Sequence, residues 1–101
     1  LVELGNLEQA LPLVTKALEL DQTESYIWDT RGELNYKLGQ YQKCIDDMDN
    51  ALIIQKNKNS YFYRGLAKIK LAKKTEGCED LKLSLELGKK EAFLELGKYC
   101  K

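Results

Sequence analysis

A repeat of 34 residues runs through the chain, and it restricts the fold more than any other feature. Residues 4–20 and residues 38–54 match position by position, from a Leu-Gly pair at the start to an apolar residue at the end. A looser third copy follows 33 residues further on. Periods of this length are typical of folds in which each repeat buries its apolar face against its neighbours. The third copy matches the second through Arg31-Gly32 with Arg64-Gly65 and Asp47-Met48 with Asp80-Leu81.

Within each copy the apolar residues follow helical spacing. Leu7, Leu11, Val14 and Leu18 lie three or four residues apart, which places them on one face of an amphipathic helix. With 44% hydrophobic residues and a single proline, the chain can bury a core and has little to interrupt helices. We expect an all-α fold, with antiparallel helices over residues 7–20, 24–38, 41–54, 59–72, 75–87 and 89–99.

The composition removes several kinds of catalytic and metal site. The chain has no histidine, and its three cysteines (Cys44, Cys78 and Cys100) lie far apart in the sequence. These facts exclude the usual zinc spacings and the Cys-His and Ser-His-Asp arrangements. An odd count without a close pair predicts structural thiols rather than a disulfide framework. The adjacent carboxylates Asp46-Asp47 and Glu79-Asp80 point about 100° apart on a helix, so we expect no enzyme activity, no cofactor and no metal.

The distribution of charge offers one alternative function. Lys+Arg and Asp+Glu both total 16, so net charge favours neither nucleic acid nor an anionic membrane as partner. Residues 56–74, however, hold seven cations, no anion and three aromatic residues, a combination that can bind single-stranded RNA or another polyanion. Acidic residues on the flanking helices would neutralise much of this segment. No apolar run approaches the roughly 20 residues that span a bilayer, so we expect a soluble protein, with the cytoplasm as the favoured compartment.

The middle copy resembles the tetratricopeptide repeat. The family pattern of aromatic, Gly, aromatic, Leu-Gly, Tyr, small, large and Ala is matched by Trp28, Gly32, Tyr36, Leu38-Gly39, Tyr41, Cys44, Met48 and Ala51. The resemblance implies a right-handed α-solenoid of antiparallel helix pairs, in which the first helix of each pair lines a concave groove. It also implies a partial repeat at 1–24, full repeats at 25–57 and 58–88, and a capping helix at 89–101.

Three details of the repeats lead to further expectations. Leu1 to Gly5 would end a truncated first helix and leave an apolar edge for upstream repeats or for self-association. Pro12 should bend the next helix, because it removes a backbone hydrogen bond. Each of two arginines is followed sixteen residues later by an aspartate. We expect these pairs, Arg31 with Asp47 and Arg64 with Asp80, to bridge the two helices of each repeat.

The resemblance also assigns groove-lining positions, which are Tyr26, Asp29, Glu33, Tyr36, Lys37, Asn59, Phe62, Leu66, Ile69 and Lys70. Phe62, Leu66 and Ile69 form an apolar stripe at helical spacing. The stripe is either a contact site for a partner or internal packing against a neighbouring helix or the cap. One subclass of the family binds the C-terminal carboxylate of a chaperone through Lys, Asn and Arg. The matching residues here, Thr30, Asn59 and Tyr63, include no cation, so we do not expect that clamp.

Together these features predict a non-enzymatic protein-interaction scaffold that binds a peptide or a helix in its groove. Acidic residues on one repeat beside the apolar stripe on the next indicate a ligand with a basic and a hydrophobic part. RNA or another polyanion bound by residues 56–74 is the first alternative, and homo-oligomeric assembly is the second.

Overall fold

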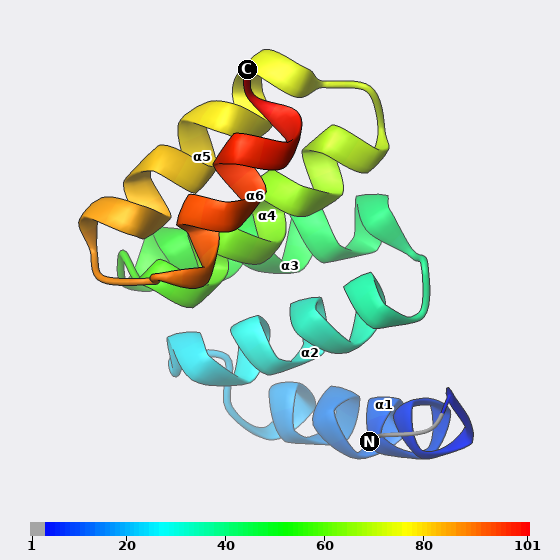
Figure 1. The fold of residues 1–101 in the computed structure, drawn as a ribbon. Coiled ribbons are helices and arrows are strands. Elements are labelled where there is room, and N and C mark those ends of the chain that lie inside the picture. The colour runs from blue at the N-terminus through cyan, green and yellow to red at the C-terminus, as the bar shows by residue number, and fades with distance from the viewer. Residues whose placement is uncertain (1–3) are drawn as a thin grey trace.

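The computed structural model describes residues 4–101, which form six α-helices joined by short turns (Figure 1). Successive helices run antiparallel and stack into an elongated body of 40 × 28 × 22 Å. Within this part of the chain the all-α prediction is confirmed, and helix ends differ from the predicted ones by at most three residues. The helices are α1 (Leu4–Leu20), α2 (Ser25–Lys37), α3 (Tyr41–Ile54), α4 (Lys58–Lys70), α5 (Lys74–Glu86) and α6 (Glu91–Tyr99).

The helices form two layers. We call α2, α4 and α6 the inner helices, because α4 contacts α2 on one side and shares an apolar cluster with α6 on the other. The outer helices are α1, α3 and α5, and each packs against the inner helix that follows it in the chain. This arrangement places α1 and α6 at the two ends of the stack (Figure 1).

The first helix differs from its prediction. A helix end was expected at Gly5, but α1 begins by Leu4 and includes Gly5 and Asn6. A Leu-Gly pair permits a left-handed turn without forcing one, because glycine also adopts helical dihedral angles. The helix also continues through Pro12. Leu1 and Val2 lie outside the described residues.

The turns between inner and outer helices use the left-handed conformation. Gly39 and Gly88 have φ angles of 78° and 104°, as expected for residues that follow a helix end. Ala72 adopts the same conformation at φ 65°, and backbone hydrogen bonds from Ala72 and Lys73 to α4 close the turn. The third copy therefore keeps the turn of the second without its glycine, at a cost of about 1–2 kcal/mol.

Close helix contacts hold each inner helix against its outer partner. A Cβ atom added at Gly32 would lie 2.8 Å from the Met48 side chain, and one at Gly65 would lie 2.8 Å from the backbone oxygen of Gly77. Met48 and Leu81 are completely buried in the two apolar clusters that these contacts flank. Gly65 is thus required for the close approach of α5 to α4, whereas the atoms facing Gly32 belong to the flexible end of the Met48 side chain.

Both predicted Arg–Asp pairs join the two helices of their repeats. Arg31 donates to the carboxylate of Asp47 at 2.8 to 3.2 Å, and two nitrogen atoms of Arg64 donate to Asp80 at 2.8 Å. Both aspartates are only 3% exposed. The hydrogen bonds from Arg64 to Asp80 raise the pKa of the guanidinium above its ordinary value. Loss of either partner would therefore leave a charge in a largely buried position.

Each of these aspartates also has a second partner that the sequence did not indicate. The amide of Asn35 donates to Asp47 at 2.9 Å, and Nζ of Lys68 lies 3.4 Å from Asp80. Asn35 and Lys68 follow their arginines by four residues in the helix, so they lie on the same face. The two buried carboxylates are thus paired with different charges, one cation for Asp47 and two for Asp80.

The expectation of three free structural thiols is wrong for two cysteines. Cys78 and Cys100 form a disulfide with a Cα–Cα distance of 5.9 Å, and Cys44 is free and buried. The antiparallel course of α5 and α6 brings the start of one helix beside the end of the other, which sequence spacing alone does not reveal. Lasting disulfides form mainly in oxidising compartments. The bridge therefore does not support the cytoplasmic location that the sequence favoured.

Candidate functional site

A polar network centred on Asn59 lies where the inner helices α2 and α4 meet. The side-chain amide of Asn59 donates to both carboxylate oxygens of Asp29, at 3.2 and 3.1 Å, and to Oε1 of Glu33 at 3.2 Å. Its carbonyl oxygen accepts a hydrogen bond of 3.1 Å from Nζ of Lys89, in the turn before α6. One side chain therefore links α2, α4 and the approach to α6.

Two neighbouring carboxylates give the inner face of α2 an acidic character. Burial raises the pKa of the Asp29 carboxyl group, while the hydrogen bonds from Asn59 act in the opposite direction. Glu33 forms an ion pair of 2.9 Å with Lys37, one helical turn further along. A basic group of a ligand would find two acceptors here, because carboxylates form the stronger, charge-assisted hydrogen bonds.

Tyrosine rings continue the inner face beside this network. The ring centroid of Tyr36 lies 5.5 Å from that of Tyr41 and 5.4 Å from that of Tyr63. Burial raises the pKa of Tyr36 and of Tyr63 to about 12, so both hydroxyl groups stay protonated at neutral pH. These partly exposed side chains can offer a ligand both a ring surface and a hydrogen-bond donor.

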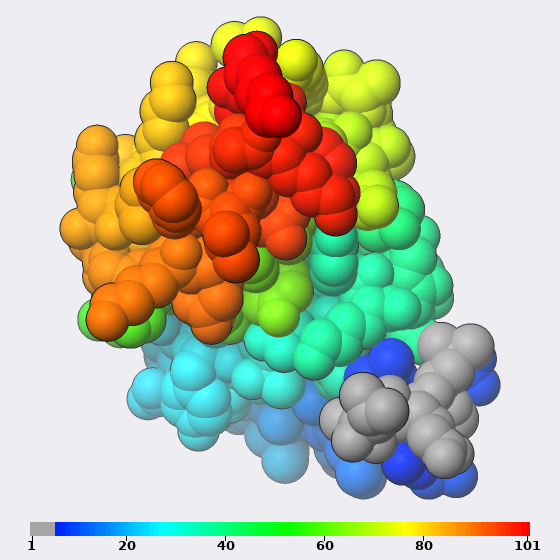
Figure 2. All heavy atoms as spheres, viewed as in Figure 1, coloured from blue at the N-terminus to red at the C-terminus, as the bar shows by residue number. Residues whose placement is uncertain are grey.

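The apolar stripe of α4 lies under the capping helix. Phe62 and Leu66 are 7% and 8% exposed, and they pack in one cluster with Ala92 of α6. Ile69 is partly exposed at the edge of this cluster. In Figure 2, α6 (orange to red) lies in front of α4 (green) and leaves only part of it visible. Phe62 and Leu66 therefore serve internal packing, the second of the two alternatives, because α6 needs an apolar surface on which to bury its own.

Three other residues assigned to the groove stay open to solvent. Tyr26 is 64% exposed on α2. Lys37 and Lys70 are exposed at the C-terminal ends of α2 and α4. Together with the network around Asn59, these residues make α2 the main contributor to the accessible inner face. Lys89 is the member of the network that sequence reasoning missed, because nothing in its spacing relates it to Asn59.

The basic segment 56–74 is divided by the fold. Arg64 and Lys68 form ion pairs with acidic residues of α3 and α5. Tyr61 and Phe62 are 8% and 7% exposed, so neither ring is available for stacking on a base. The exposed cations that remain lie at the two ends of α4 and at the start of α5, and they are Lys56, Lys58, Lys70, Lys73 and Lys74.

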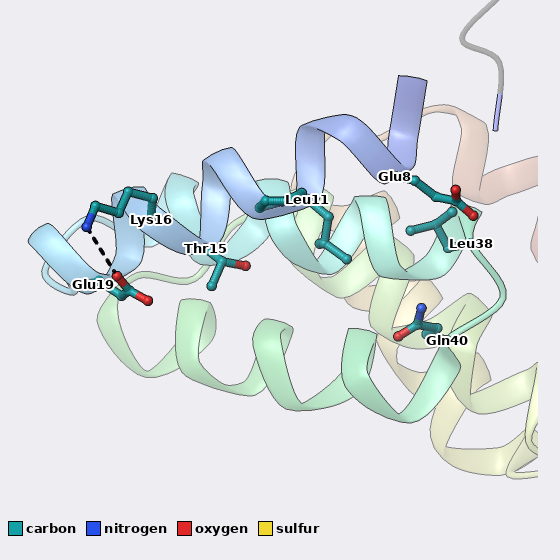
Figure 3. A pocket seen from close by; sticks show the side chains of 8 residues that line it. Glu8, Leu11, Thr15, Lys16, Glu19, Leu38 and Gln40 are labelled. Carbon is teal, nitrogen blue, oxygen red and sulfur yellow. Dashed lines mark ion pairs between the residues drawn. The ribbon is translucent and has the colours of Figure 1, made fainter. Parts of the chain in front are cut away.

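A hollow of about 630 Å³ lies away from the inner face, between α1 and the turn that joins α2 to α3 (Figure 3). Lys16 and Glu19 form an exposed ion pair of 3.7 Å at its rim. None of the residues predicted to bind a ligand lines it. Its lining is mixed, and it consists of Glu8, Leu11, Pro12, Thr15, Lys16, Glu19, Leu38 and Gln40.

The described residues offer little for catalysis. They contain no group of three or more His, Cys, Asp or Glu residues that could hold a metal ion. Cys44 is fully buried, and burial raises the pKa of its thiol to about 12. A protonated, inaccessible thiol is a poor nucleophile. Among residues 4–101 we also find no helix with the length and apolar character required to cross a membrane.

The stacked inner and outer helices define an α-helical solenoid, and solved structures show which known fold it shares. The chain matches the first TPR of Spaghetti (RPAP3), bound to the HSP90 peptide SRMEEVD, with a TM-score of 0.88 and 26% identity over 94% of this chain and 78% of that one. The second TPR domain of human RPAP3, in complex with the HSP70 peptide SGPTIEEVD, gives 0.87 and 26% over 96% and 83%. The chain therefore has the tetratricopeptide-repeat fold.

A more distant structure supports the same fold. MamA matches with a TM-score of 0.86 and 17% identity, over 94% of this chain and 57% of MamA. No protein-family model and no curated protein matches the chain. The repeat fold thus persists here with few of its neighbours' residues, because packing between helices tolerates many sequences.

Proposed function

We propose that this chain is a non-enzymatic protein-interaction module that binds a peptide segment of a partner on the inner face of α2 and α4. The proposal is carried by the fold that the chain shares with tetratricopeptide-repeat domains solved with peptides bound. Rigid helices hold the accessible groups in a fixed order along this face. Tyr26 comes first, the carboxylates of Asp29 and Glu33 follow, and the rings of Tyr36 and Tyr63 come last.

The ligand we propose carries a basic residue. The peptides bound by the RPAP3 domains end in the acidic sequence EEVD. In this chain the amide hydrogens of Asn59 already bind Asp29 and Glu33, so they are not free for a ligand carboxylate, whereas the two carboxylates can accept hydrogen bonds from a cation. With Phe62 and Leu66 covered by α6, the hydrophobic part of the ligand would contact Tyr26.

Two peptides of opposite charge test this proposal. An NMR titration of the isotope-labelled chain would compare SRMEEVD with the charge-reversed peptide SRMKKVK. We expect SRMKKVK to shift the amide signals of α2 and α4 and to bind with a dissociation constant on the order of 0.1–1 mM, because the accessible face is small. SRMEEVD should bind at least about tenfold more weakly.

Matched variants locate the binding face. Glu33→Gln should weaken SRMKKVK binding about threefold, since an exposed ion pair contributes up to about 1 kcal/mol. Glu79→Gln, on the exposed surface of α5, is the control and should change nothing. Equal binding of both peptides, or indifference to Glu33→Gln, would contradict the ligand class. Binding of single-stranded RNA that weakens steeply with salt and is lost with Lys73→Ala and Lys74→Ala would instead support a polyanion partner.

A further inference from the structure

The N-terminal end of the stack has an unfilled apolar hollow. It measures about 260 Å³ and lies between α1 and α2. Leu13 on α1 and Tyr26 on α2 are 73% and 64% exposed there. Contiguous exposed apolar surface, rather than single side chains, marks a contact site. The hollow is lined by Leu13, Val14, Ala17, Tyr26, Ile27 and Thr30.

The internal repeat shows which kind of element fills such a hollow. The residues of α3 and α5 that match its α1 lining are exposed by 3% or less, because α2 covers those of α3 and α4 covers those of α5. The hollow is therefore the position of an inner helix that packs on α1. By the offsets of 34 and 33 residues, Leu13, Val14 and Ala17 match Asp47, Met48 and Ala51, and then Asp80, Leu81 and Ser84.

The opposite end of the stack has the complementary feature. α6 is an inner helix that packs on α4 and α5 around Ala92. On its other side Phe93 and Leu94 are 68% and 74% exposed, and a Cβ atom added at Gly97 would meet nothing within 4 Å. The same side of α4, which includes Gly65, is buried against α5. Among the described residues α6 is thus an inner helix that no outer helix follows, whereas α1 is an outer helix that no inner helix precedes.

Inside the stack an Arg–Asp pair joins the inner and outer helices. At the matching positions of the two ends stand residues of complementary size. Arg31 of α2 binds Asp47 of α3, and the next repeat forms the same pair. The repeat offsets place Gly97 at the arginine position of α6 and Leu13 at the aspartate position of α1. Both charges are therefore replaced together. A large apolar side chain at one end corresponds to open space at the other.

At a second contact the larger residue moves from the outer helix to the inner one. Gly32 of α2 faces the large side chain of Met48, which leaves no room for a Cβ atom. At the matching end positions stand Lys98 on α6 and Val14 on α1, so the larger residue is now on the inner helix and the smaller on the outer one. The aliphatic part of a lysine can cover apolar surface while its charge stays in water. Val14 is shorter than Met48, so it leaves part of the space that Met48 fills inside the stack for the aliphatic part of Lys98.

We propose that a second copy of this chain fills the N-terminal hollow with its α6, so that copies associate head to tail. Leu94 and Phe93 of one copy would pack against Leu13 and Val14 of the next, in the geometry that α2 and α3 have within the chain. The contact is heterologous, so each copy keeps one free end and longer assemblies can grow. This surface shares Tyr26 with the proposed peptide site but includes neither Asp29 nor Glu33, and the proposal does not depend on the peptide-binding function.

Two single variants and their mixture test the proposal. Leu13→Asp blocks the N-terminal hollow, and Leu94→Asp blocks α6; both side chains are exposed, so the fold should be retained by circular dichroism. We expect the wild-type chain to show a molar mass that rises with concentration in sedimentation equilibrium, up to about 1 mM, as for a small interface. Each variant alone should stay monomeric. Their equimolar mixture should form a 1:1 dimer and nothing larger, because only one intact pair of ends remains.

The outcomes separate this assembly from others. A wild-type chain that is monomeric at all these concentrations would overturn the proposal. Dimers of Leu94→Asp alone would show a symmetric contact between two N-terminal ends, which also overturns it. A double variant tests which residues of the two ends face each other. Gly97→Arg combined with Leu13→Asp should restore association that either change alone abolishes, because the two residues recreate the Arg–Asp pair. Failure of this rescue would overturn the proposed pairing of Gly97 with Leu13.

Discussion

The two inner helices α2 and α4 occupy equivalent positions in successive repeats, yet they present different surfaces. Asp29 and Glu33 of α2 match Phe62 and Leu66 of α4 at an offset of 33 residues. The carboxylates hold the amide of Asn59 and remain partly exposed, whereas the apolar pair is buried with Ala92 under α6. Whether the exposed face of an inner helix is polar or apolar thus depends on the inner helix that packs next to it in the stack.

Contacts within each helix pair, in contrast, are almost the same in both repeats. An arginine on the inner helix binds a buried aspartate on the outer one, and a glycine one residue later allows the two helices to approach. These contacts are internal to a pair, so the neighbouring pair does not alter their type. Contacts within pairs are therefore repeated along the molecule, whereas contacts between pairs vary.

The largest difference between the pairs should appear on removal of the buried aspartates. Asp80→Ala leaves both Arg64 and Lys68 without their buried partner, and we expect a loss of about 3–5 kcal/mol in the free energy of unfolding. Asp47→Ala leaves one cation, Arg31, and the neutral amide of Asn35 without this partner, and its cost should lie at or below the lower end of this range. Urea denaturation followed by circular dichroism measures both. The exposed Asp46→Ala is the control, and equal losses for Asp47 and Asp80 would contradict the role assigned to Lys68.

The disulfide should stabilise the C-terminal end alone. Cys100→Ser opens a link across 22 residues, which costs about 3 kcal/mol. Amide hydrogen exchange should become faster in α6 and in the part of α4 beneath it, while α2 changes little. Reductant should have the same effect on the wild-type chain and no effect on Cys100→Ser. Uniformly faster exchange over all helices would show that the bridge supports the whole stack.

The glycines of the two inner helices should respond unequally to the same change. A Cβ atom at Gly65 meets the backbone oxygen of Gly77, which cannot move without shifting α5, so Gly65→Ala should destabilise by about 2–3 kcal/mol. At Gly32 the obstacle is the flexible end of Met48, and alanine also favours the helix by up to about 1 kcal/mol. Gly32→Ala should therefore cost less than about 1 kcal/mol in thermal unfolding. Similar losses would mean that both pairs are equally tight.

The smallest effect concerns the partly buried carboxylate of α2. Because burial raises the pKa of Asp29 above 3.8, the unfolded chain loses this proton first as pH rises, and stability falls through that window. Asp29→Asn removes this cost. At pH 7 it should raise the melting temperature, with a gain of less than about 1 kcal/mol in the free energy of unfolding. The gain should shrink towards pH 3. Asp46→Asn, on the exposed face of α3, should show no gain, and an equal gain there would contradict the burial argument.

Much of the fold could be predicted because its signals are local or periodic. Helical spacing located every described helix, and the equal separation of Arg31 from Asp47 and Arg64 from Asp80 predicted two bridges that the structure contains. The prediction at Gly5 was wrong. A Leu-Gly pair follows the end of α2 at Leu38-Gly39, but the matching pair, Leu4-Gly5, belongs to α1. The same two residues form a turn or part of a helix, depending on the residues around them.

The sequence by itself determined the helices, the repeat and the Arg–Asp bridge inside each helix pair, because these depend on residues at fixed spacings. Only the tertiary structure decided that Phe62 and Leu66 are covered, that Cys78 meets Cys100, and that Lys89 completes the network of Asn59. All three depend on where α6 lies against α4 and α5. That position results from the burial of apolar surface between helices, which has no fixed spacing along the chain.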